Sequence, residues 1–213
     1  MTFDRIDVKT LRRLAWMALP LVALAGLVVE ILHHAVASPE VEPWVALLSL
    51  SEEANLPTWY ASALLLTSAL LLTGHAARAR RHRAGWWFMA AALAYVSFDE
   101  VAQVHELLNE VVAGEGVLTF GWIVPAALVL VALLVAYLPF LRDLPALTRR
   151  RFLVAAAVYV GGALLMELPL GWWADRAGEE NLGYALIDFG EEVLELVGAT
   201  LFLDAVLDHE EGG

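Results

Sequence analysis

Residues 14–33, LAWMALPLVALAGLVVEILH, form an apolar stretch that is long enough to cross a bilayer as a helix. The hydrocarbon core of a bilayer needs about 20 helical residues at a rise of about 1.5 Å each. A signal peptide also follows basic residues with an apolar run, but this run is longer than usual and carries Glu30 and His33 near its end. We therefore interpret it as the first transmembrane span.

Further apolar stretches of this length follow, and 60% of the 213 residues are hydrophobic. Backbone groups in lipid must be hydrogen-bonded within the protein, and these runs are too long and too unalternating for barrel strands. The sequence therefore predicts an all-α integral membrane bundle of six transmembrane helices that forms a single domain over 1–213. The predicted spans cover about 14–33, 59–76, 85–105, 120–141, 152–170 and 182–206.

Basic residues set the expected orientation of this bundle. Of the 13 Lys and Arg residues, four precede the first span, four follow the second and four follow the fourth, whereas Arg176 lies in an opposite loop. Because Lys and Arg mark cytoplasmic loops, we expect both termini in the cytoplasm. The expected location is the plasma membrane, with an acidic cytoplasmic tail over 207–213.

Composition excludes several classes of site. The net charge of −12 argues against nucleic-acid binding, which needs basic residues on the binding face. The absence of cysteine excludes disulfides, thiolate metal sites, iron–sulfur clusters and cysteine nucleophiles. A retinal Schiff base needs a lysine within the membrane, and the single lysine, Lys9, precedes the first span. Any metal ion must therefore bind oxygen and imidazole ligands.

Acidic and histidine residues gather at the expected extracytoplasmic ends of four spans. Ionisable groups at this depth are costly and need partners, yet almost no Lys or Arg is near them in the sequence. So many carboxylates must bind a cation, share protons or reach water. The candidate metal ligands are Glu30, His33, Asp99, His105, Glu106, Glu167, Glu192 and Glu195.

Short motifs refine this ligand set. Glu30-Ile-Leu-His33 resembles, in ligand type, the Glu-x-x-His elements of helix-bundle di-metal carboxylate proteins, which use two such elements where this chain has one. On a continuous third span, Asp99, His105 and Glu106 share one face, and Glu100 points elsewhere. The first acids of the last span also suit a plain acidic first turn, which the helix dipole favours.

The favoured hypothesis is a metal-dependent membrane enzyme that acts on a lipid-like substrate. It would be a hydrolase or a di-iron oxidoreductase, with iron, manganese or zinc as the divalent metal. Glu106 and Glu192 are the candidate catalytic bases. One alternative is a proton or divalent-cation transporter that uses the same carboxylates, although the inner halves of the spans offer few polar residues. Another alternative is a non-catalytic subunit of a membrane complex.

Overall fold

The chain folds into a bundle of helices. The structure is a computed structural model that describes residues 7–36, 38–109, 111–112 and 114–212, without the side chains of residues 106, 108, 109 and 210–212. No strand occurs among these residues, which confirms the predicted all-α fold. The elements are α1 (Val8–Val36), α2 (Glu42–Leu48), α3 (Leu56–Arg78), α4 (Arg83–Ala102), α5 (Val104–Asn109), η1 (Gly116–Leu118), α6 (Ile123–Asp143), α7 (Ala146–Val160), η2 (Gly161–Met166), α8 (Glu167–Ala177) and α9 (Leu182–Gly212).

Four helical segments are long and apolar enough to cross a membrane. They are α1, α3, α6 and the continuous rod Ala146–Ala177, which joins α7, the π-helical turn η2 and α8. The chain therefore has the character of an integral membrane protein. The third and sixth expected spans fall on α4 and α9, which are long but more polar, since α4 ends with Asp99 and Glu100 and α9 carries a row of acids.

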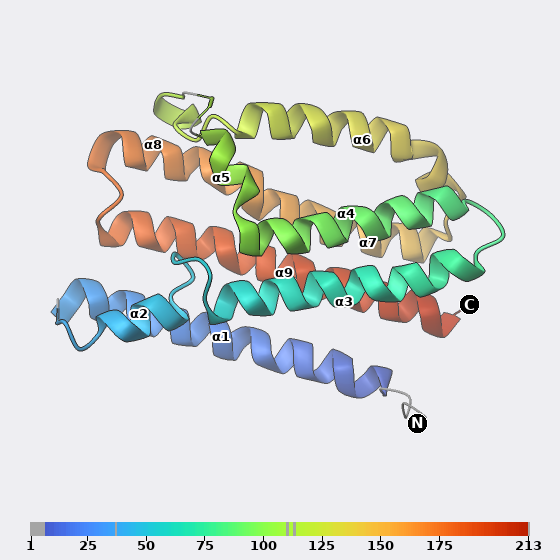
Figure 1. The fold of residues 1–213 in the computed structure, drawn as a ribbon, viewed down its shortest axis with the longest axis horizontal. Coiled ribbons are helices and arrows are strands. Elements are labelled where there is room, and N and C mark those ends of the chain that lie inside the picture. Colours follow the sequence, from blue (N-terminus) through green and yellow to red (C-terminus); the bar gives the residue numbers. More distant parts are fainter. Residues whose placement is uncertain (1–6, 37, 110, 113, 213) are drawn as a thin grey trace.

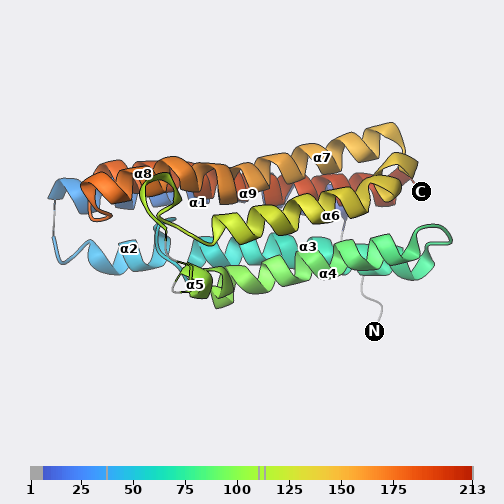
Figure 2. The same cartoon turned by 90° about the horizontal axis from the view of Figure 1, so that it is seen from above.

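The helices of the bundle are arranged around α9. This helix packs against α1, α3 and α7, and α3 and α4 form an antiparallel hairpin beside it. Figure 2 shows α3 and α4 on one side of the bundle and α7, α8 and α9 on the other. The larger apolar core includes Leu72, Trp86, Phe152 and Leu203, all nearly inaccessible to solvent.

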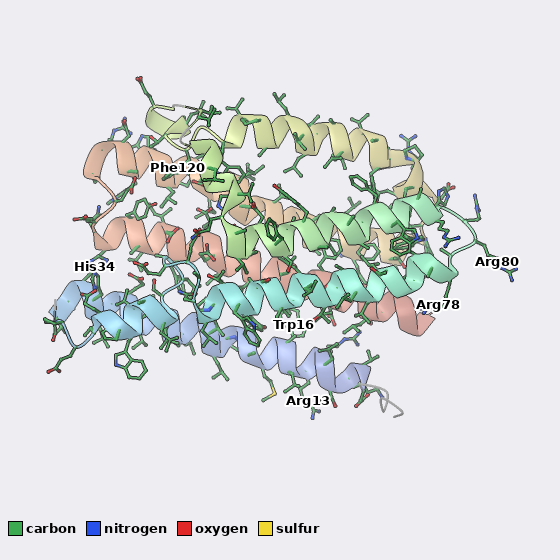
Figure 3. All side chains as sticks on the ribbon, in the orientation of Figure 1. Arg13, Trp16, His34, Arg78, Arg80 and Phe120 are labelled. Atoms are coloured by element: carbon green, nitrogen blue, oxygen red, sulfur yellow. The ribbon has the colours of Figure 1, made fainter. Side chains whose placement is uncertain are left out.

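The two ends of the bundle differ in charge. Both termini lie at the same end (Figure 1). In Figure 3, Arg13, Arg78 and Arg80 lie toward this end, and His34 lies at the opposite one. We call the first the basic end and the second the acidic end. The sequence predicted that these basic residues and both termini share one side.

The expected third span is shorter than predicted. α4 stops at Ala102, and Gln103 adopts the left-handed conformation, with φ of 54° and ψ of 39°. The chain then starts a new helix, α5, at Val104. A single non-glycine residue in this region of φ/ψ space redirects the chain, so the expected continuous helix to His105 is wrong.

Candidate functional site

An acidic stripe lies along the first half of α9. Asp188, Glu191, Glu192 and Glu195 are about one helical turn apart, which brings their side chains to one face. The segment η2 packs closely against this face because Gly162 has no side chain: a Cβ there would lie 2.8 Å from the Glu191 carbonyl oxygen and 2.9 Å from Glu195 Cγ. Single π-helical turns such as η2 are frequent at functional sites.

Glu100 of α4 joins this stripe through Tyr159 of α7. The Tyr159 hydroxyl donates a hydrogen bond of 2.6 Å to Glu100 Oε1, and the Glu195 carboxylate lies within reach of the same hydroxyl. The expectation that Glu100 points elsewhere is therefore wrong. That expectation assumed one continuous helix on both sides of position 103. Because the helix breaks at Gln103, residues before and after it do not share a helix face.

His105 and Glu167 belong to a second arm of the site. The Asp99 carboxylate holds His105 twice, through Oδ2 to Nδ1 at 2.8 Å and through Oδ1 to the backbone N–H at 3.2 Å. The His105 ring packs against Trp122, with ring centroids 5.2 Å apart. The Trp122 indole N–H in turn donates to Glu167 Oε1 at 2.9 Å. The arm therefore connects the end of α4 to the start of α8.

Glu191 is a buried acid that is surrounded by other acids. It is only 7% exposed, and its Oε2 has no hydrogen-bond partner within the described part of the chain. The charged groups that act on it are Glu167, Glu195 and Asp188, all carboxylates. An ionised carboxylate in this position is costly unless a cation or a proton compensates its charge. We call Glu100, Glu167, Asp188, Glu191, Glu192 and Glu195 the carboxylate cluster.

Glu30 and His33 of α1 contact different residues. Glu30 is 4% exposed and accepts a hydrogen bond from the Ser49 hydroxyl, and its other oxygen lies 3.8 Å from His34 Nε2. His33 instead pairs with Glu42 of α2, at 3.1 Å between Nδ1 and Oε1. The Glu-x-x-His element therefore sends its two side chains to different partners. Glu30 still acts electrostatically on Asp188, so it borders the carboxylate cluster.

The structure does not bring the predicted ligands together around one ion. Among the residues whose side chains are described, no group of three His, Asp or Glu residues could hold a metal ion as it stands. Of the eight predicted ligands, Glu167, Glu192 and Glu195 lie in the carboxylate cluster, Asp99 and His105 flank it, and Glu30 borders it. The predicted catalytic residue Glu106 has a side chain outside the described set.

Sequence reasoning missed two contributors to this site, Ser49 and Trp122, and gave a third little weight. Tyr159 could be expected to support a site by hydrogen bonding, but aromatic packing is the default for such a residue. Ser49 lies in a polar loop where a hydroxyl is unremarkable. Trp122 would have been noticed only as an interfacial aromatic residue. The contact of Gly162 with α9 could have been suspected, because small residues in membrane helices permit close packing.

Comparison with known proteins adds a family but no function. One family model matches residues 9–209, and its description is a domain of unknown function, DUF8692. The chain belongs to this family. No curated protein and no solved structure matches it.

Proposed function

We propose that this DUF8692 member binds a divalent metal ion at its carboxylate cluster and is a metal-dependent membrane enzyme. The single observation that carries the proposal is Glu191, buried among other carboxylates with one oxygen lacking a hydrogen-bond partner in the described residues. The proposal includes six transmembrane spans with both termini cytoplasmic, so that the site opens at the extracytoplasmic end. The basic end, with Arg13, Arg78 and Arg80, then faces the cytoplasm.

The charge balance of the cluster supports a bound cation. The charged residues acting on Glu192 and Glu195 in the described structure are carboxylates, as they are for Glu191. The hydrogen-bond donors to the cluster include the Tyr159 hydroxyl, the Trp122 indole and the Ser51 hydroxyl, which acts on Asp188, and all three are neutral. Neutral donors do not compensate several negative charges in a medium of low dielectric constant. A divalent ion does so directly, after rotation of carboxylates toward it.

The donor set favours particular metals. Carboxylate oxygens dominate it, with one imidazole, His105, beside Glu100. Such ligands suit manganese or iron better than zinc, which takes more imidazole or thiolate. An ion held by these carboxylates would supply activated water for hydrolysis, and a di-iron pair would supply oxidation of a substrate by dioxygen. In hydrolysis a spare carboxylate such as Glu192 would serve as the general base.

A transport function is less well supported. A proton or cation relay needs polar groups that continue toward the cytoplasmic end. Below Glu195, α9 instead buries Leu196, Ala199 and Leu203, and the Thr200 hydroxyl donates to the Leu196 carbonyl of its own helix. This apolar layer separates the carboxylate cluster from the next acid on α9, Asp204.

Metal binding by purified protein tests the proposal. We expect the wild type in detergent to retain about one or two Mn²⁺ ions after equilibrium dialysis and elemental analysis. Glu191→Gln and Glu195→Gln should each weaken binding at least tenfold. Glu180→Gln, in the exposed loop before α9, is the matched control and should bind normally. A folded wild type that binds neither Mn²⁺, Fe²⁺ nor Zn²⁺ would contradict the proposal.

A flux measurement separates the enzyme from the transporter. Protein reconstituted into liposomes should bind Mn²⁺ without carrying Mn²⁺ or protons across the bilayer. Flux that disappears in Glu195→Gln would instead support transport by the same carboxylates.

A further inference from the structure

The fully buried residues of helix α6 lie near its two ends. At its cytoplasmic-side end, the Tyr137 hydroxyl donates to the Gly85 carbonyl of α4, and Phe140 packs on Trp86. At its other end, the capping residue Trp122 contacts His105 and Glu167. Its buried residues are Ile123, Phe140 and Leu141, all within the first or last turn. Between these ends, no other described element packs extensively against α6, which lies at the edge of the bundle in Figure 1.

One side of α4 faces this loosely packed stretch. Phe88, Tyr95 and Asp99 lie within about 40° of each other around α4, at about 100° per residue. Phe88 packs against Tyr137 of α6, and Asp99 holds His105, which packs against Trp122 at the start of α6. Tyr95 lies between them on this side and is nevertheless 56% exposed. α6 therefore does not cover this side of α4 at the level just below Asp99, and we call the uncovered stretch the opening between α4 and α6.

A helix from a second copy, about 10 Å wide, does not pass between two helices that are joined at both ends. An acyl chain is much thinner, and acyl chains surround any helix in a bilayer.

We propose that an acyl chain of a membrane-derived amphiphile occupies the opening between α4 and α6 and that its polar end reaches the carboxylate cluster. This inference rests on the proposed function and adds the substrate class and its route, which is lateral from the bilayer. The opening ends at Asp99, His105 and Trp122, and Trp122 is bonded to Glu167 of the carboxylate cluster. An amphiphile whose chain lies beside Tyr95 therefore has its head at the metal site.

Spin labelling provides a direct test because the chain has no cysteine. Nitroxides are attached at Tyr95→Cys and Leu133→Cys, which face the opening, and at Val135→Cys, which is 61% exposed on the opposite side of α6. In lipid vesicles, we expect the oxygen accessibility of the first two to be within about twofold of the third, with little accessibility to a water-soluble nickel complex. High nickel accessibility would show a water-filled space, and low accessibility to both reagents would show a protein contact. Either result overturns the proposal.

A filling substitution tests the route independently of metal binding. Leu130 lies on the Tyr137 side of α6, and Leu130→Trp should reduce the oxygen accessibility of the Tyr95 label at least threefold. It should also remove co-purifying amphiphile, detected by native mass spectrometry, while Mn²⁺ affinity stays at the wild-type value. If Mn²⁺ binding is absent in all variants but Tyr95 contacts lipid, the proposed function fails and the lipid-filled opening stands. Equal amounts of amphiphile in Leu130→Trp and wild type would overturn the route.

Discussion

The acids at the two ends of the bundle have opposite surroundings. At the basic end, Asp204 and Asp208 of α9 both pair with Arg12 of α1, and Asp208 also pairs with Arg151 of α7, at 2.5 Å between Oδ2 and Nη1. At the acidic end, Glu191 and Glu195, on the same helix, meet other carboxylates. One helix therefore carries acids that are matched with cations at one end and acids that are concentrated together at the other.

This difference separates a structural role from a functional one. The arginine pairs connect α1, α7 and α9, so they contribute to the stability of the bundle. We expect the carboxylate cluster to reduce stability when no cation is bound, because its buried acids repel one another. Groups that reduce stability persist in proteins when function requires them, as in strained or charged active sites. We therefore expect substitutions of acids at the two ends to change stability in opposite directions.

The largest change in stability is expected for Asp208→Ala at the basic end. This change leaves Arg12 and Arg151 without their shared partner, and the pairs are shielded, with side-chain exposure of 30% for Arg12 and 20% for Asp208. The free energy of unfolding should fall by about 2–3 kcal/mol, the usual range for hydrogen bonds to charged groups that are partly buried. Unfolding in mixed micelles, followed by far-ultraviolet circular dichroism, measures it.

An exposed pair serves as the control for Asp208. Asp143 pairs with Arg81, whose side chain is 83% exposed, and with His82 at 2.7 Å. Because exposed ion pairs contribute less than about 1 kcal/mol, Asp143→Ala should have a small effect. Equal losses for Asp143→Ala and Asp208→Ala would show that burial does not decide the value of these pairs.

A loss of stability of similar or smaller size is expected for Gly198→Ala, where α7 meets α9 between the two ends. A Cβ on Gly198 would lie 2.5 Å from the Tyr159 backbone nitrogen. Gly198→Ala therefore pushes α7 away from α9, and overpacking of this kind costs about 1–3 kcal/mol. Since Tyr159 joins Glu100 to the cluster, Mn²⁺ binding should weaken as well.

Gly190→Ala is the matched change on the same helix. The nearest atom to its added Cβ would be Met166 Cε at 3.6 Å, an ordinary contact. This variant should keep wild-type stability or gain up to about 1 kcal/mol from helix propensity. If both alanine variants unfold alike, then close packing of α7 on α9 does not hold the two ends in place.

The helices and the end at which the acids gather were predictable because both depend on regular patterns. Long apolar runs indicate helices in lipid, and the arginines in alternate loops identify one end. These patterns extend over many residues, so errors at single positions do not change the result. The sequence placed Glu167, Glu192 and Glu195 in the same layer on this basis alone, and the structure brings them within electrostatic reach of one another.

The partners of individual side chains were not predictable because each depends on a local event. The left-handed Gln103 ends α4 and changes the direction of everything after it, and no sequence rule marks glutamine for that conformation. The short helix α2 brings Glu42 to His33, which removes His33 from Glu30. The hydrogen bond from Tyr159 to Glu100 joins α7 to α4 across 59 positions of the sequence. Such contacts follow from tertiary packing.

Glu191→Gln at the acidic end is expected to change stability least, and it should raise stability where the other substitutions of acids lower it. Glutamine has the same shape and removes one negative charge from a group of carboxylates. Its side-chain N–H can also donate a hydrogen bond to the carboxylate of Glu167 or Asp188. In chelator-treated protein, the free energy of unfolding should therefore rise by about 1 kcal/mol, the typical net value of one hydrogen bond. Glu180→Gln in the exposed loop should change it by less than about 0.5 kcal/mol. A loss of stability in Glu191→Gln would mean that Glu191 is held by favourable contacts even without a cation, and the acids at the two ends of α9 would then have the same role.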